Sequence, residues 1–183
     1  MNYSDAELQV MLADPSKRAQ AFAFVVRSWQ ERIYWHIRKM VLTHDDANDV
    51  MQNTFLKAWK AIESFRGESM ISTWIYRIAT NETLTFLANK RLRNVQSIDD
   101  EETSLYQHME ADTYFDGNEA EAKLQRAILT LPEKQRLVFN MKYFEDITYD
   151  EMEAVLGTSV GALKASYHHA VKKIERFLEE EEY

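Results

Sequence analysis

Residues 148–173 constrain the fold of this chain more than any other segment, because they encode two helices joined by a tight turn. Thr148 and Glu151 form the Thr-x-x-Glu pattern of a capping box, which begins a helix by satisfying its free backbone N–H groups. Gly157 is suited to end that helix in the left-handed conformation, and Ser159 can cap the next one. The segment therefore predicts a short helix, a glycine turn and a longer second helix.

The second of these helices has an apolar face and a polar face. Leu163, Tyr167, Ala170 and Val171 recur at helical spacing and are expected to pack against the first helix. The outward face carries small, polar and basic side chains: Ser159, Ala162, Lys164, Ser166, His168, His169, Lys172 and Lys173. Such side chains suit contacts with base edges and phosphates. The layout is that of a helix-turn-helix DNA reader, although a plain helical hairpin gives the same pattern.

The composition of the whole chain also favours helices. Its 183 residues include 4 Gly and 2 Pro, and 45% are hydrophobic, which is enough for packed cores. The absence of cysteine excludes disulfides and thiolate chemistry and fits a reducing compartment. No signal peptide pattern and no long apolar run is visible, so we expect a cytoplasmic protein without a membrane span.

The net charge of −8 is unevenly distributed along the chain. Residues 1–93 carry 13 basic and 10 acidic side chains. Residues 94–122 carry 9 acidic side chains and no basic ones. Residues 123–183 carry 9 basic and 11 acidic side chains, four of the latter at 179–182. The two outer blocks can therefore present local basic faces. Because phosphate neutralisation supplies most non-specific affinity, the weak net field predicts weak DNA binding without a partner.

Start signals divide the first block into four helices. Ser4 and Glu7 form a second capping box, and Asp14-Pro15 is interpreted as the N-cap and first residue of a second helix. Thr43 is expected to cap a third helix. A glycine-containing loop separates the third helix from a fourth, which ends in a basic cluster.

An acidic, poorly periodic segment then interrupts the helical pattern, as expected of a linker that is partly disordered when alone. The predicted fold class is all-α, with two small helical domains joined by this acidic linker. The first domain spans residues 1–93, the linker 94–119, and the second domain, which contains the helix-turn-helix, 120–183.

Four quoted stretches resemble one family in their order and spacing. They are Asp45-Asp-Ala-Asn-Asp-Val-Met-Gln-Asn-Thr-Phe-Leu-Lys-Ala-Trp59, Phe65-Arg-Gly-Glu-Ser69, Thr73-Trp-Ile-Tyr-Arg-Ile-Ala-Thr-Asn81, and Leu131-Pro-Glu-Lys-Gln-Arg136 followed by the helical pair. They are similar to the extracytoplasmic-function sigma factors, two-domain bacterial initiation factors that bind core RNA polymerase. The resemblance covers residues 8–93 and 120–178, and the wording of residues 168–173 also resembles Bacteroidetes-type members.

The resemblance implies a role for the third helix of the first domain. Its outer face is expected to dock onto core RNA polymerase, while buried Phe55 and Trp59 hold that face in place. The polymerase-binding residues implied are Asp46, Asp49, Gln52, Asn53, Leu56 and Lys57. The alternative is an ordinary solvated helix face.

The loop and fourth helix are similar to the segment that opens the −10 element of a promoter. The residues implied are Ser64, Phe65, Arg66, Gly67, Ser69, Tyr76, Arg77, Asn81, Lys90 and Arg91. Small polar groups could hold one flipped base, and the basic groups, with Arg93, would steer the single strand. Tyr76 is expected to be an exposed stacking surface and Trp74 a core residue. The alternative is an ordinary interhelical turn.

The outward face of the last helix then corresponds to the reader of the −35 element. The family often has Thr-Val-Lys-Ser-Arg where this chain has Ala162-Leu-Lys-Ala-Ser166, which leaves Lys164 as the main inherited contact. His168 and His169 point about 100° apart on a helix and cannot share a metal face, so no metal site is expected.

The function implied is that of a sigma factor that binds core RNA polymerase and promoter DNA, and control by an anti-sigma factor is expected. The acidic linker, with Asp99, Asp100, Glu101 and Glu102, is either a spacer or a segment threaded into the polymerase cleft. No catalytic or cofactor-binding pattern is recognisable, so neither an enzyme, a cofactor nor a small-molecule substrate is expected. Two rivals remain: a stand-alone helix-turn-helix regulator, and a helical adaptor or anti-sigma-like partner that does not bind DNA.

Overall fold

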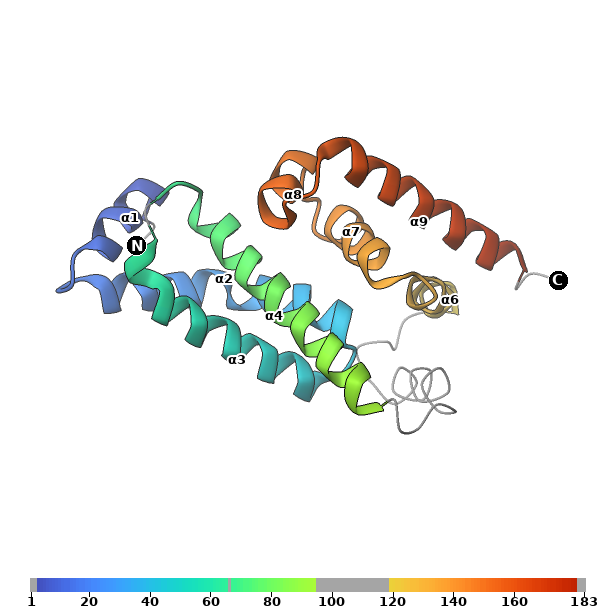
Figure 1. Ribbon diagram of the computed structural model, residues 1–183, viewed down its shortest axis with the longest axis horizontal. Coiled ribbons are helices and arrows are strands. Elements are labelled where there is room, and N and C mark those ends of the chain that lie inside the picture. Colours follow the sequence, from blue (N-terminus) through green and yellow to red (C-terminus); the bar gives the residue numbers. More distant parts are fainter. Residues whose placement is uncertain (1–2, 66, 95–118, 181–183) are drawn as a thin grey trace.

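The computed structural model describes residues 3–65, 67–94 and 119–180, and all regular structure within these ranges is helical (Figure 1). The first group of helices is α1 (Asp5–Ala13), α2 (Arg18–Val41), α3 (His44–Ala61), the short 3-10 helix η1 (Ile62–Ser64) and α4 (Ile71–Asn94). The second group is α6 (Glu119–Leu129), α7 (Glu133–Tyr143), α8 (Tyr149–Leu156) and α9 (Val160–Glu180). The all-α prediction is therefore confirmed. No described helix is long and apolar enough to cross a bilayer.

The predicted capping residues begin and end several of these helices. Thr148 accepts a hydrogen bond from the backbone N–H of Glu151, whose carboxylate accepts one in return from the backbone N–H of Thr148. Gly157 ends α8 with a φ of 65°, a conformation that an L-residue adopts only at a cost. Thr43 caps α3 by accepting from the backbone N–H of Asp46 at 3.2 Å. Local sequence thus determines where α3 begins and where α8 begins and ends.

The predicted start of the second helix is wrong by several residues. Asp14 does not cap α2, because its carboxylate accepts from the backbone N–H of Ser16 at 2.9 Å and so forms a local turn. Its own N–H group bonds to the carbonyl of Val10 and closes α1. The helix begins only at Arg18, which donates to the carbonyl of Leu12 and to Glu63.

Helices α1 to α4 form the first domain around the facing apolar stripes of α2, α3 and α4. Ile33, Ile37, Ala47, Ile75 and Ala79 are completely shielded from solvent there. The expected buried stripe of α3 is only partly realised. Phe55 is half-buried, and Trp59, expected to be buried, is 42% exposed and contacts the Phe22 ring in a tilted arrangement.

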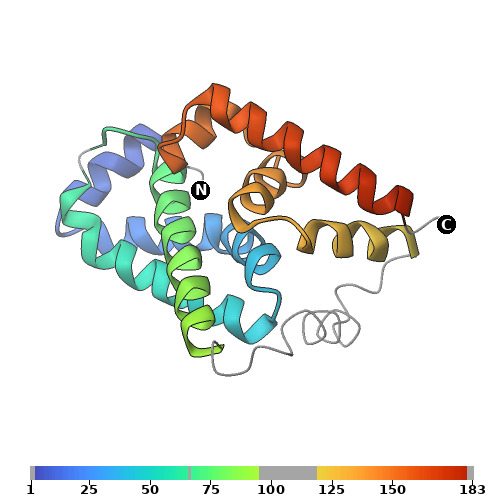
Figure 2. The same ribbon diagram turned by 45° about the vertical axis from the view of Figure 1, so that its right-hand side comes forward.

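Helices α6 to α9 form the second domain. Its own cluster comprises Ala127, Ile128, Leu131, Phe139, Ala170 and Ile174. The Phe139 ring stacks on Tyr167 of α9, with ring centres 5.8 Å apart, and so joins α7 to α9. Helix α9 runs along α6 and α7 with its other face turned outward (Figure 2).

The two domains pack against each other. Helix α8 lies against α4 and α7 lies against α2, so that residues distant in sequence become neighbours (Figures 1 and 2). One continuous buried cluster contains Ile37 and Ile75 of the first domain together with Met141 and Met152 of the second. The predicted acidic linker, with Asp99, Asp100, Glu101 and Glu102, lies outside the described residues.

Candidate nucleic-acid and polymerase interfaces

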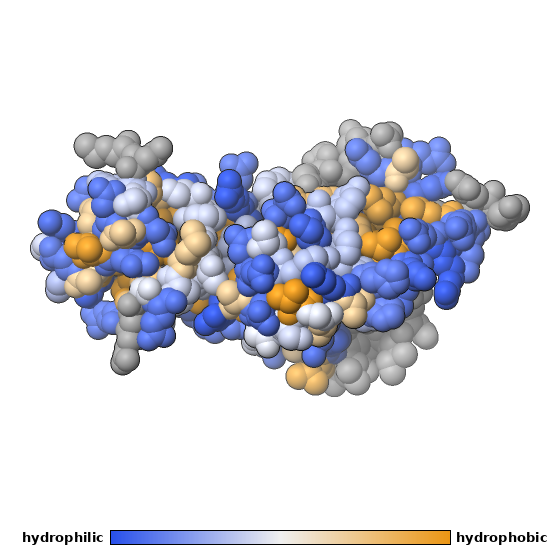
Figure 3. Space-filling view, turned by 90° about the horizontal axis from the view of Figure 1, so that it is seen from above, coloured by the Kyte–Doolittle hydropathy of each residue, from blue (hydrophilic) through white to orange (hydrophobic). Residues whose placement is uncertain are grey.

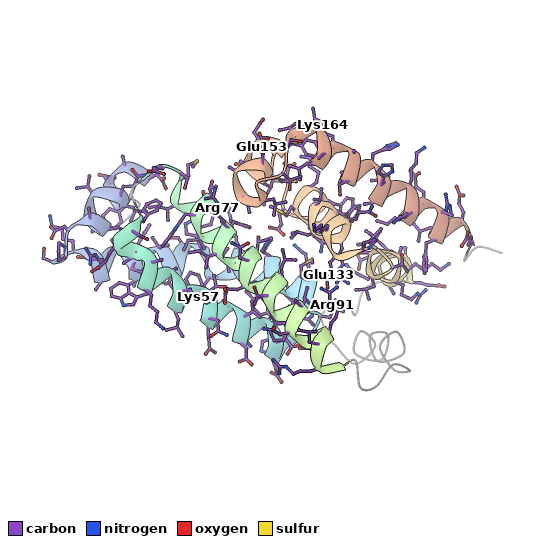
Figure 4. All side chains as sticks on the ribbon, viewed as in Figure 1. Lys57, Arg77, Arg91, Glu133, Glu153 and Lys164 are labelled. Carbon is purple, nitrogen blue, oxygen red and sulfur yellow. The ribbon has the colours of Figure 1, made fainter. Side chains whose placement is uncertain are left out.

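The outward face of α9 is open to solvent. The hydroxyl of Ser159 accepts from the backbone N–H of Ala162 at 3.4 Å and so caps the helix, while Leu163 and Ala170 on the opposite face are buried. The predicted −35 residues Ser159, Ala162, Lys164, His168, His169 and Lys172 are all exposed, and Ser166 is half-buried. Lys164 points away from the first domain in Figure 4. The structure therefore leaves all of these residues except Ser166 exposed.

A neighbouring basic group escaped the sequence analysis. The ammonium groups of Lys142 on α7 and Lys164 on α9 each lie 5.8 Å from the ring centre of Tyr149, at the start of α8. The three residues come from three different helices, so no sequence spacing could have placed them together. Lys142 also pairs with the Asp146 carboxylate at 3.1 Å, so its positive charge is partly neutralised there.

The imidazole rings of His168 and His169 are neighbours on α9. Their ring centres are 6.0 Å apart and the ring planes are inclined by 56°. Within residues 3–65, 67–94 and 119–180, no group of three or more potential ligands converges on a point where an ion could be held. Both imidazoles are exposed on the open face of α9.

The outer face of α3 divides into two parts. Asp49, Gln52 and Asn53 are exposed, and so is the apolar Leu56, at 58%. The other two predicted polymerase-binding residues are tied to α4. These pairs join the Asp46 carboxylate to the Lys90 ammonium at 2.8 Å and the Lys57 ammonium to the Glu82 carboxylate at 2.5 Å.

The glycine loop before α4 is built by local contacts. The Phe65 ring packs against Trp74, with centres 4.9 Å apart, and the Ser64 hydroxyl donates to the carbonyl of Ala61. Gly67 has a φ of 71°, and an added Cβ would lie 2.9 Å from the side-chain oxygen of Gln9. The positive φ therefore favours glycine here, whereas the close contact is with the end of the flexible Gln9 side chain, which can move aside. The predicted site residue Arg66 lies outside the described residues, and Ser69 is half-buried.

The predicted −10 residues of α4 have contrasting environments. Asn81 is exposed, but the expectation that Tyr76 is an exposed stacking surface is wrong, because Tyr76 is 9% exposed. Its ring lies 5.1 Å from His36 and 6.4 Å from Trp29. Burial, reinforced by the nearby charge of Glu145, raises the pKa of the Tyr76 hydroxyl far above its ordinary value. Tyr76 is thus a neutral component of the domain boundary.

Two basic side chains of α4 contact the second domain. Arg77 donates to the carbonyl of Ala154 on α8. Arg91 forms an ion pair with Glu133 on α7, with nitrogen and oxygen 3.2 Å apart. Figure 4 shows both arginines on the side of α4 that faces the second domain. Part of the predicted −10 surface is therefore occupied by the protein itself.

A buried polar cluster lies between the two domains. His36 on α2 is 1% exposed, and its Nδ1 lies 3.2 Å from both carboxylate oxygens of Glu145, in the loop between α7 and α8. Its Nε2 lies 2.9 Å from the hydroxyl oxygen of Thr80 on α4. Because a carboxylate only accepts hydrogen bonds, Nδ1 carries a proton. The Lys39 ammonium lies 4.0 Å from the Glu145 carboxylate.

This environment keeps Glu145 ionised. Burial raises the pKa of its carboxyl, but His36, Lys39 and the Tyr76 hydroxyl together outweigh burial and hold the pKa below its ordinary value. Beside the cluster, a cleft of about 740 Å³ is lined from both domains by aromatic and charged side chains. Sequence reasoning missed the cluster because His36 and Glu145 are 109 positions apart.

Both domains match regions of the sigma-70 family. Residues 25–93 match the family described as Sigma-70 region 2, and residues 121–174 match Sigma-70, region 4. Together the two matches cover more than half of the chain. The chain belongs to the extracytoplasmic-function sigma factors, which direct transcription.

Individual relatives agree with this assignment. The chain is 29% identical to the ECF RNA polymerase sigma factor SigW of Bacillus subtilis, over 86% of this chain and 89% of the relative. It is 28% identical to the ECF RNA polymerase sigma-E factor of Escherichia coli K12, over 91% of this chain and 92% of the relative. The likeness to Bacteroidetes-type members stays a prediction.

Two solved structures have the same fold. CnrH, in complex with the cytosolic domain of CnrY, gives a TM-score of 0.70 at 22% identity, covering 96% of this chain and 97% of CnrH. The sigma factor RpoE of Bartonella quintana, in complex with the anti-sigma factor NepR, gives 0.64 at 20% identity, covering 86% of this chain and 96% of RpoE.

Proposed function

We propose that residues 1–93 bind core RNA polymerase and open the −10 element, that residues 94–119 link the domains, and that residues 120–183 read the −35 element. The observation that carries this proposal is the capped helix-turn-helix with its predicted contact residues on one exposed face of α9. A helix of this kind presents its N-terminal residues to base edges in the major groove.

Docking on the polymerase is assigned to the outer face of α3. Leu56 is an exposed apolar side chain, and its neighbours Asp49, Gln52 and Asn53 are exposed and polar. An apolar centre with a polar rim is the usual anatomy of a protein interface. Asp46 and Lys57 act indirectly here, since their ion pairs fix α3 against α4.

Opening of the −10 element is assigned to the loop and to α4. Ser64, Ser69 and Asn81 offer small polar groups for the edge of a flipped base. Arg77, Lys90 and Arg91, with Arg66, supply positive charge along the path of the single strand. Phe65 supports the loop through its contact with Trp74.

Three further proposals concern the cellular compartment, catalysis and regulation. We infer that the protein works in the cytoplasm, has no catalytic activity of its own, and is held inactive by an anti-sigma factor. The inference of an anti-sigma factor is supported by CnrH and RpoE, the latter solved with its anti-sigma factor. The polymerase supplies the chemistry of RNA synthesis.

In-vitro transcription tests this function. Purified protein, core RNA polymerase and fragments of the host genome should give discrete start sites that share a two-part upstream motif. Failure to bind core polymerase, together with tight DNA binding by the protein alone, would favour a stand-alone regulator. Failure of both kinds of binding would favour the helical adaptor.

A further inference from the structure

Helix α1 lies against the glycine loop that precedes α4, although the two are far apart in sequence. In Figures 1 and 2 the segment that leads from η1 into α4 passes beside α1. Leu8 and Leu12 of α1 belong to the same buried cluster as Ile71, the first residue of α4. The match to Sigma-70 region 2 begins only at position 25, so it does not account for the contacts that α1 makes.

One carboxylate of α1 caps the N-terminus of α4. The Asp5 carboxylate accepts a hydrogen bond from the backbone N–H of Ile71 at 3.2 Å, across 66 positions of the sequence. The first backbone N–H groups of a helix have no partner within it, and the helix dipole favours a carboxylate beside them. Met70, directly before α4, has no side-chain oxygen that could accept this hydrogen bond. Asp5 therefore supplies a cap that residue 70 does not provide.

The middle of the loop also contacts α1. The Gln9 side chain lies so close to Gly67 that a Cβ added to this glycine would be 2.9 Å from the Gln9 side-chain oxygen. Asp5 and Gln9 are four residues apart on α1, so they lie on the same face of that helix. Both side chains are half-buried. One face of α1 therefore contacts the chain at Gly67 and again at Ile71.

Arg18 connects the end of α1 to the start of the loop. Its Nε donates to the carbonyl of Leu12 in the last turn of α1 at 2.9 Å. One of its terminal nitrogens donates to the Glu63 carboxylate in η1 at 2.6 Å. The chain on both sides of the loop is thus held to α1. A loop that is ordered before it binds loses less conformational entropy in the binding step.

We propose that Asp5 is a positioning residue for promoter opening: by capping α4, it holds the loop between η1 and α4 in the conformation that receives the flipped −10 base. This inference rests on the proposed function. Extruding a base costs stacking free energy, which a loop of fixed shape returns through its contacts with that base. Asp5 acts through the backbone of the loop and not through a contact with DNA.

Binding of −10 oligonucleotides to the assembled holoenzyme tests this role. Full-length protein is mixed with core RNA polymerase, and affinity is measured for single-stranded DNA that carries the −10 sequence found by in-vitro transcription. Each base of the element is then removed in turn. The position whose loss weakens wild-type binding most identifies the flipped base. The base ratio is the affinity with this base divided by the affinity without it.

Two substitutions of Asp5 differ in whether a cap remains. Asp5→Ala removes the cap, whereas Asp5→Asn keeps an oxygen that can accept from the N–H of Ile71. A side-chain cap shifts the equilibrium at a helix end about fivefold, so the base ratio should fall about fivefold in Asp5→Ala and stay within about twofold of wild type in Asp5→Asn. Glu119→Ala is the matched control, because it removes an exposed acidic side chain from the first turn of α6. Its base ratio should equal that of the wild type, and all variants should bind core polymerase equally.

A restored cap distinguishes capping from a general loss of stability. Met70 is 58% exposed, so Met70→Ser can supply a cap from the residue before α4 without disturbing the core. The Asp5→Ala, Met70→Ser variant should recover the wild-type base ratio. Hydrogen exchange of the free protein gives a readout that needs no polymerase. The Ile71 amide should exchange about fivefold faster in Asp5→Ala and at the wild-type rate in Glu119→Ala.

The possible outcomes separate this role from the proposed function. An unchanged base ratio in Asp5→Ala, even with faster exchange at Ile71, would overturn the positioning role and leave the proposed function intact. A base ratio that stays low in Asp5→Ala, Met70→Ser would also overturn it, because capping would then not be the cause. Wild-type holoenzyme whose binding depends on no base of the −10 element would overturn the proposed function, and the positioning role with it.

Discussion

The two predicted DNA-binding faces of this sigma factor differ in what surrounds them. The face on α9 is exposed along its length, whereas the face on α4 is partly engaged by α7 and α8. From above, the surface is largely hydrophilic, and its hydrophobic residues form separate patches (Figure 3). Exposure of the predicted DNA-reading helix is therefore a local property, whereas access to the predicted DNA-melting surface depends on how the two domains are arranged.

The largest expected effect concerns the packing that presents the α9 face. Leu163 is 1% exposed, so Leu163→Ala should lower the free energy of unfolding by about 2–5 kcal/mol. Leu92, which is 75% exposed on α4, is the matched control, and Leu92→Ala should change stability by less than about 0.5 kcal/mol. Urea unfolding measures both. Similar losses for the two variants would contradict the assigned core.

The α9 face itself is tested by a charge reversal. Lys164→Glu should reduce transcription from a cognate promoter about 10–100-fold, since one specific contact contributes about 1–3 kcal/mol. Lys134 on α7 is also exposed, and Lys134→Glu should leave transcription close to wild type. Affinity for core polymerase should stay unchanged in both variants. A Lys164→Glu variant with full activity would remove α9 from promoter reading.

Substitution by alanine at two glycines of the second domain should change the free energy of unfolding in opposite directions. Gly157 has a φ of 65°, so Gly157→Ala should cost about 1–2 kcal/mol through backbone strain alone, because an added Cβ meets no atom within 4 Å. Gly161 lies inside α9 with equally open space, and Gly161→Ala should stabilise the helix by about 0.5–1 kcal/mol. Thermal unfolding measures both changes. Stabilisation by Gly157→Ala would exclude the turn described.

The smallest expected effect is a pH dependence of domain closure. The pKa of Glu145 is lower in the closed form than its ordinary value of 4.5, so the closed form binds the proton less tightly. The ionised Glu145 carboxylate therefore stabilises the packing of the two domains above about pH 4.5. This stabilisation is lost as the pH falls through the lowered pKa of Glu145. Small-angle scattering should show expansion in that range for the wild type, relative to Glu145→Gln. Identical profiles would exclude Glu145 as the titrating group.

The sequence predicted those features that depend on neighbours along the chain. The capping boxes, the glycine end of α8 and the two faces of α9 follow from residues three or four positions apart. The family resemblance predicted the class of protein, which the family matches confirm. The start of α2, the exposure of Trp59 and the burial of Tyr76 were predicted wrongly. The first depends on a competing local turn, and the other two depend on packing that periodicity does not encode.

The boundary cluster could not be predicted at all. His36 occupies an ordinary position on a helix, and Glu145 lies in a loop that looks solvated in sequence. Their contact depends on how α7 and α8 dock on α2 and α4. Only the assembled fold brings these two residues together, and only there does their pairing suggest control of access to the α4 face.

We expect this sigma factor to read two promoter elements with domains that pack together in the free protein and lie apart on the polymerase. Fluorophores on an Arg27→Cys, Glu175→Cys variant, which place one label on α2 and one on α9, would report the distance between the domains by energy transfer. The distance should be short in the free protein and increase toward the promoter-element spacing of about 85 Å when core polymerase and promoter are added. An unchanged distance during productive transcription would contradict the account.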